Sequence, residues 1–192
     1  MELLTSPYLT REAGGFYAPD EAVRSRIQHL EHIVDFLPYM ATVDAFQHWL
    51  YAHPGHGRFE RDAAWQTLHE TYCVAADWSG LEGWRAAQWQ HKQHIFQSPL
   101  YYIEYGIAQL GALQVWRASL EDPVRAFEDY RRALSLGGTR TLPELYAAAG
   151  ARLAFEPDRV AELVELIERH VERMDSELAA LRAGSGGSGP ER

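Results

Sequence analysis

The residues best suited to chemistry lie in one stretch of this 192-residue chain, QWQHKQHIFQSPLYYIEYGIAQLGALQVW. In this stretch His91 and His94 come just before three tyrosines, Tyr101, Tyr102 and Tyr105, at the start of an expected helix. Tyr101 and Tyr105 are four residues apart, so their hydroxyls would project from the same face of that helix. Phenols near an imidazole can donate hydrogen bonds to a carbonyl oxygen that gains negative charge. The alternative is an aromatic core helix whose hydroxyls reach solvent at one end, and spacing alone favours it.

Nine histidines raise the question of a metal site. The segment HETYC, from His69 to Cys73, comes close to the zinc-binding motif H-E-x-x-H, but it has cysteine at the second ligand position. His91 and His94 are three residues apart and could chelate a metal, yet no nearby Asp or Glu completes three ligands. We therefore expect His69 to lie on the surface of an amphipathic helix, and we expect no complete zinc site within this chain.

Composition narrows the class of protein. Hydrophobic residues at 46% and aromatic residues at 12% suit a packed core and argue against disorder. The net charge of −9 argues against a nucleic-acid-binding surface. Cys73 is the only cysteine, so no disulfide can form within the chain. The first residues do not resemble a signal peptide, and no apolar run approaches the roughly 20 residues of a membrane span. The expected location is the cytoplasm.

The elements that must position these side chains are all expected to be helices. Apolar residues recur at helical spacing between Pro or Asp starts and Gly ends, and no segment has the pattern of a strand. Pro38 should kink or briefly break the first long helix. The predicted helices are 19–50, 60–72, 81–96, 99–119, 123–136, 141–150 and one from 157, with a loop at 52–59 and a turn at 77–80. Residues 1–182 are expected to form one helical portion and residues 183–192 a disordered Gly/Ser tail.

Three separate segments of the chain resemble one family in the right order: PYMATVDAFQHWLYAHP, SPLYYIEYGIAQLGALQVW and DYRRALSLGGTRTLPELYAAAG. They are similar to the C-terminal part of the oligoendopeptidase F-like zinc metallopeptidases, which belong to the wider thimet oligopeptidase family. The similarity covers nearly everything from Met1 to about Met174. It implies an all-α fold, the C-terminal helical part of a zincin-type oligopeptidase catalytic domain.

The resemblance also implies a zinc-dependent metalloendopeptidase that hydrolyses oligopeptides. In the family, zinc is held by the two histidines of H-E-x-x-H and by a glutamate on the next helix, and the glutamate of the motif activates water. This chain contains no H-E-x-x-H, and its first residues, Met1-Glu2-Leu3-Leu4, look like the continuation of the helix that carries the third ligand. Zinc is therefore expected in the complete enzyme, none is expected on residues of this chain, and this chain alone should be inactive.

By the same resemblance, the catalytic residues are Tyr105, which would donate to the oxyanion, and His94, which would orient the substrate or share that charge. Tyr101, Tyr102 and His91 would bind substrate. Expected partners are short peptides and either a missing N-terminal half or a second copy of the chain. No nucleic acid and no membrane are expected. The alternative function is a non-catalytic helical module, derived from the peptidase, that binds peptides or other proteins.

Overall fold

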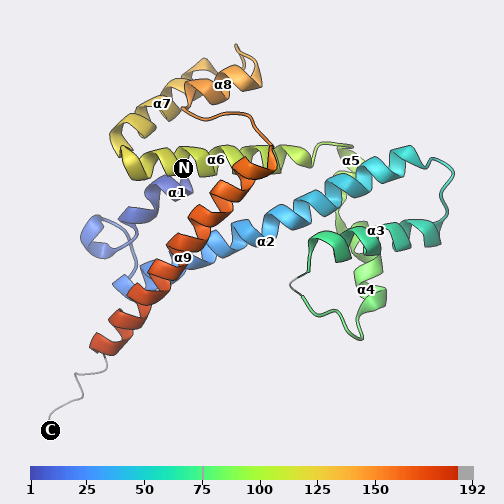
Figure 1. Cartoon of the computed structure of the whole chain (residues 1–192), viewed down its shortest axis with the longest axis horizontal. Coiled ribbons are helices and arrows are strands. Elements are labelled where there is room, and N and C mark those ends of the chain that lie inside the picture. The colour runs from blue at the N-terminus through green and yellow to red at the C-terminus, as the bar shows by residue number, and fades with distance from the viewer. Residues whose placement is uncertain (75, 186–192) are drawn as a thin grey trace, which may run out of the picture. The chain divides into compact units, whose positions relative to one another are not determined.

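The computed structural model describes residues 1–74 and 76–185 (Figure 1). Every regular element in these ranges is a helix, and the nearest thing to a strand is an isolated bridge between Thr10 and Tyr17. The expected all-α fold is therefore confirmed. Within the same ranges, no helix combines the length and the apolar character needed to cross a membrane.

The chain forms two compact units. Unit 1 comprises residues 1–32 and those from 109 onward, and unit 2 comprises residues 33–108, so that α2 and α6 contribute to both. The α-helices (α) and 3-10 helices (η) run in the order α1 (Glu2–Thr5), η1 (Ser6–Tyr8), η2 (Arg11–Ala13), α2 (Pro19–Ala52), α3 (Arg58–Tyr72), α4 (Glu82–Ala87), η3 (Gln88–His91), α5 (Gln93–Gln97), α6 (Ile103–Glu121), α7 (Pro123–Leu136), α8 (Leu142–Ala148) and α9 (Pro157–Ser185).

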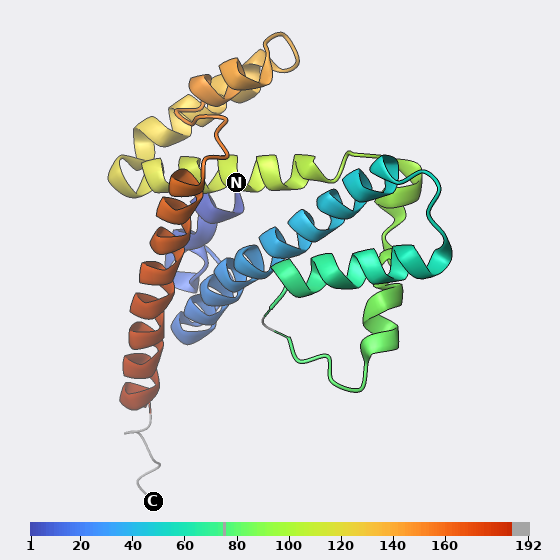
Figure 2. The ribbon, with the colours of Figure 1, turned by 45° about the vertical axis from the view of Figure 1, so that its right-hand side comes forward.

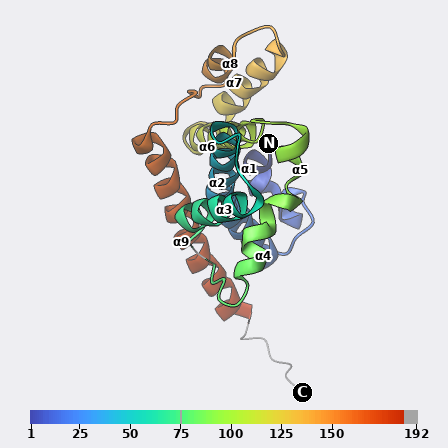
Figure 3. The ribbon, with the colours of Figure 1, turned by 90° about the vertical axis from the view of Figure 1, so that its right-hand side faces the viewer.

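Unit 2 is built on aromatic side chains. Phe46 of α2 and Trp65 of α3 are fully buried and meet edge to face, with ring centroids 5.3 Å apart. Helices α3 and α4 pack against one another in this unit (Figure 3). We predicted that Pro38 would kink or briefly break this helix, and α2 is not broken there, since it runs from Pro19 to Ala52 with Pro38 inside it. The aromatic core thus rests on two long, continuous helices.

Unit 1 contains a hairpin formed by α7 and α8, which lie side by side (Figure 2). Its helix starts follow the sequence signals: Asp122 accepts a hydrogen bond from the backbone N–H of Arg125, and Thr141 and Glu144 form a capping box. Gly111 of α6 allows a close approach to Tyr146 of α8, because a Cβ on Gly111 would lie 2.8 Å from that ring. Helices predicted at 123–136 and 141–150 are confirmed.

Two predicted helices differ from the structure. The segment 81–96 forms three short helices, and Lys92 is extended between η3 and α5, with φ −86° and ψ 91°. Helix α6 begins at Ile103 instead of Pro99, so Tyr101 and Tyr102 precede the helix that carries Tyr105. In both places tertiary packing overrides the local helical pattern.

The C-terminal helix is longer than expected. Helix α9 extends through Ser185, so residues 183–185 of the expected disordered tail are helical. The rest of that tail, residues 186–192, lies outside the described residues.

Candidate functional site

His94 and Tyr105 form the centre of the candidate site in unit 2. His94 Nε2 lies 3.0 Å from the hydroxyl of Tyr105, within hydrogen-bonding distance. The two rings meet edge to face, with centroids 5.4 Å apart. Tyr105 is 40% exposed, and His94 is half-buried. A phenol and an imidazole are therefore paired at a place that solvent reaches.

The rings of the other two tyrosines, Tyr101 and Tyr102, both contact the rings of His94 and Tyr105. The ring of Tyr101 is parallel to that of His94 and perpendicular to that of Tyr105, and it is 49% exposed. Tyr102 is only 5% exposed, and its ring lies 5.2 Å from those of both His94 and Tyr105. We predicted one helical face for Tyr101 and Tyr105. Their rings do meet, but Tyr101 reaches the cluster from the turn before α6.

That turn depends on a residue the sequence did not single out. Leu100 has a positive φ of 59°, which is uncommon for a residue other than glycine. Its backbone N–H donates to the side-chain oxygen of Gln47 over 2.7 Å, and Gln47 is 1% exposed. A polar side chain on the buried face of α2 thus fixes the backbone that presents the tyrosines. In the sequence, Gln47 lies on the same helix face as the apolar residues Val43, Phe46 and Leu50, and this position could have indicated a buried polar side chain.

Lys92 lies beneath the cluster. Its ammonium group donates to the Tyr102 hydroxyl over 3.2 Å and stands 4.9 Å from the ring centroids of both Tyr39 and Tyr102. Burial lowers the pKa of Lys92, but the hydrogen bond to Tyr102 and the attraction of the Tyr39 and Tyr102 oxygens outweigh burial, so the pKa lies above 10.5. Burial raises the pKa of Tyr39 above 10.0, although Lys92 opposes this. At neutral pH the lysine is charged and Tyr39 is neutral.

His91, the remaining predicted site residue, is not part of the cluster. It ends η3 and is exposed. Among the described residues it makes no hydrogen bond or ring contact with His94 or the tyrosines. The extended backbone at Lys92 separates His91 from α5, where His94 lies.

The sequence also matches a known family. The model for peptidase family M3 matches residues 4–164. The chain belongs to peptidase family M3. The resemblance inferred from the three segments is thereby confirmed, and the M3 match spans residues of both units.

Two solved structures support the M3 assignment. A 3.1 Å X-ray structure of a protein provisionally named oligoendopeptidase F is 35% identical over 79% of this chain, with a TM-score of 0.75. A structure of PZ peptidase A with an inhibitor is 31% identical over 90% of this chain, with a TM-score of 0.80. The M3 chain spans only 27% and 30% of the lengths of these two proteins. A comparison with curated proteins found no match.

The M3 family implies a metal, and the described residues do not fit one. Within residues 1–74 and 76–185, no three His, Cys, Asp or Glu side chains come together as a ligand set. His69, in the near-match to H-E-x-x-H, was expected on a helix surface, but it is 4% exposed and packs between the rings of Trp65 and Trp78. The expectation was wrong because α3 turns this face into the aromatic core.

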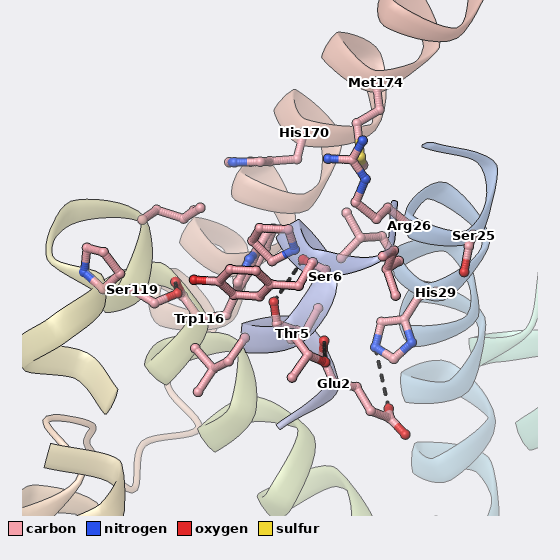
Figure 4. Close-up of a pocket in the computed structure, with 18 of the residues that line it drawn as sticks. Glu2, Thr5, Ser6, Ser25, Arg26, His29, Trp116, Ser119, His170 and Met174 are labelled. Atoms are coloured by element: carbon pink, nitrogen blue, oxygen red, sulfur yellow. Dashed lines mark hydrogen bonds and ion pairs between the residues drawn. The ribbon is translucent and has the colours of Figure 1, made fainter. Parts of the chain in front are cut away.

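Unit 1 of the M3 chain contains a separate cavity of about 750 Å³ (Figure 4). Its charged lining is balanced, with Arg26 and Arg173 against Glu2 and Glu177, and Arg26 lies 3.4 Å from Glu177. His170 donates its Nδ1 proton to the backbone oxygen of Leu166 over 2.8 Å. In the same cavity, His29 Nε2 lies 3.8 Å from a carboxylate oxygen of Glu2.

Proposed function

We propose that this chain forms the substrate-binding and oxyanion-stabilising wall of a zinc-dependent metalloendopeptidase that hydrolyses oligopeptides. The observation that carries the proposal is the His94–Tyr105 pair, in which a half-exposed phenol is bonded to an imidazole over 3.0 Å. Membership of family M3 supports the reaction class. The zinc chemistry would be supplied by an H-E-x-x-H helix, a motif that does not occur in this sequence.

The pair can stabilise a developing oxyanion in the following way. When His94 carries its proton on Nε2, it donates to the Tyr105 oxygen and leaves the phenolic O–H free for the substrate carbonyl oxygen. A hydrogen bond received by a phenol polarises its own O–H and strengthens the next bond in the chain. Tyr105 would then donate to the oxyanion, and His94 would hold and polarise it.

The proposed roles of the other residues follow from their exposure. Tyr101 is exposed beside the pair and could contact the peptide. Tyr102, which we expected to bind substrate, is buried, so we assign it the support of His94 and Tyr105. His91 lies apart from the cluster, so a direct role in binding would need a peptide that extends beyond it.

Calorimetric titration of the 192-residue chain with a short unstructured peptide tests the proposal. We expect peptide binding, no hydrolysis by the chain alone with added zinc, and chelator-sensitive hydrolysis once a companion polypeptide with the H-E-x-x-H helix of an M3 peptidase is added. Absence of both peptide binding and complementation would overturn the proposal. Peptide binding without complementation would favour the non-catalytic peptide-binding module. Robust hydrolysis by the chain alone would contradict its expected inactivity.

A further inference from the structure

The cation beneath the tyrosine cluster is fixed in place. Lys92 is the only lysine in the chain, against 17 arginines. Its ammonium group has a hydrogen-bond acceptor in Tyr102 and ring faces of Tyr39 and Tyr102 at 4.9 Å, within the range of cation–π attraction. Three contacts, from Tyr39 of α2 and from Tyr102 in the turn before α6, hold a flexible side chain in one position.

The charge of this lysine is not neutralised by a carboxylate. None of the ion pairs formed by the described residues includes Lys92. Phenols and ring faces stabilise an ammonium group but carry no compensating negative charge. A half-buried positive charge therefore remains available to attract an anion nearby.

One ring connects this charge to the candidate site. The Tyr102 ring centroid lies 4.9 Å from the ammonium nitrogen and 5.2 Å from the Tyr105 ring centroid, so the ammonium lies within about 10 Å of Tyr105. The same ring lies 5.2 Å from that of His94. Tyr102 thus contacts all three partners from its buried position.

We infer that Lys92 is a positioning residue of this wall, which anchors Tyr102 against His94 and Tyr105 and places a positive charge behind the site of the oxyanion. This inference rests on the proposed function. Its effect should be selective, because a positive charge favours an anionic tetrahedral group over a neutral amide. A single charge acting over roughly 10 Å at an effective dielectric constant near 20 changes affinity by about tenfold.

The test compares two ligands on the full chain: a phosphinic peptide analogue blocked at both ends, whose phosphinate is its only charge, and the matching blocked amide peptide. Lys92→Met should weaken phosphinate binding about tenfold and amide binding less than about twofold. Lys92→Arg should restore most of the phosphinate affinity. Arg58→Met, which removes an exposed cation from the same unit, is the matched control and should alter neither affinity.

A spectroscopic readout accompanies the affinities. Lysine labelled with ¹⁵N gives a single side-chain signal, since only Lys92 carries the label. That signal should shift when the phosphinate analogue binds, and Tyr102→Phe should perturb it in the free chain. Thermal melts establish that each variant is folded. Should Lys92→Met fail to fold, Tyr102→Phe, which keeps the ring and loses the acceptor, should still reduce phosphinate affinity selectively.

The outcomes separate this inference from the proposed function. Equal losses of phosphinate and amide binding in Lys92→Met, or equal effects of Lys92→Met and Arg58→Met, would overturn the role of Lys92 while leaving the peptide-binding wall intact. If the unsubstituted chain binds neither ligand, the proposed function fails, and the inference fails with it.

Discussion

His94 and His170 are both packed against aromatic rings, but in opposite chemical settings. In unit 1, His170 lies edge to face with Trp116 and donates to a backbone oxygen, beside arginines and glutamates present in equal number. In unit 2, His94 is bonded to the hydroxyl of a half-exposed tyrosine, and Lys92 beneath the cluster forms no ion pair with a carboxylate of the described part of the chain. The cavity in unit 1 is lined by equal numbers of arginines and glutamates, whereas the tyrosine cluster in unit 2 combines a half-exposed phenol with an ammonium group. The two histidines therefore differ in the groups that they contact and in the charges beside them.

The largest effect expected from this contrast concerns Tyr105. In the enzyme complemented with an H-E-x-x-H polypeptide, Tyr105→Phe removes the proposed oxyanion donor and should lower kcat by about 100- to 1000-fold. His170→Gln, the matched change in unit 1, should leave kcat within about twofold, because that histidine lies outside the cluster. Steady-state peptide hydrolysis measures both. A comparable loss of kcat in the two variants would contradict the proposal that only the cluster in unit 2 takes part in catalysis.

A second, smaller effect compares two glycines of α6. A Cβ on Gly111 would lie 2.8 Å from the Tyr146 ring, whereas a Cβ on Gly106 would overlap the end of the Met40 side chain. Methionine has three flexible side-chain torsions and can move aside, whereas a tyrosine has only two torsions and a rigid ring, so it yields less easily. Gly111→Ala should lower the free energy of unfolding by about 1–3 kcal/mol.

Both substitutions gain about 1 kcal/mol of helix propensity, because both glycines lie inside α6, and for Gly106→Ala this gain should offset most of the strain. Urea denaturation monitored by circular dichroism gives both values. A larger loss of unfolding free energy in Gly106→Ala than in Gly111→Ala would contradict the expected order. The two outcomes differ because the neighbour of Gly106 is the end of a methionine side chain and that of Gly111 is a tyrosine ring.

Most of the helices could be predicted because their signals are local. Asp122-Pro123, Thr141 with Glu144, and Pro157 mark helix starts through caps and fixed φ angles, which need no tertiary partner. The segment 81–103 could not be predicted in this way. Its extended Lys92 and left-handed Leu100 are stabilised by Tyr102 and Gln47, and the latter is 53 residues away from Leu100 in the sequence.

The candidate site was predicted in part for the same reason. Family resemblance identified His94 and the tyrosines, and the structure brings four of the five predicted residues together. The resemblance did not distinguish the buried Tyr102 from the exposed Tyr101, because burial depends on packing against Phe36 and Tyr39 of α2. The importance of Lys92 depends on contacts that no spacing rule describes.

The smallest effect expected is on the pH dependence of stability, to which each unit contributes one histidine. Burial, with help from the charge of Arg85, lowers the pKa of His69. Burial also lowers the pKa of His170, with the charges of Arg173 and Arg169 acting in the same direction and the hydrogen bond to Leu166 opposing them. Both pKa values lie below the ordinary 6.5 in the folded chain, so below that pH the unfolded chain binds more protons.

Stability should therefore be fully present above about pH 6.5 and should fall as the pH drops through the lowered values. Between about pH 5 and 6.5 the histidines should dominate this slope, because the carboxylates with lowered pKa values, such as Glu144 and Glu162, have ordinary values of 4.5 and act at lower pH. His69→Gln should flatten the slope more than His170→Gln, since His69 is 4% exposed and His170 is half-buried. Melting temperatures across this range test the order. If His170→Gln flattened the slope more, the charges of Arg173 and Arg169 in unit 1 would outweigh burial in unit 2.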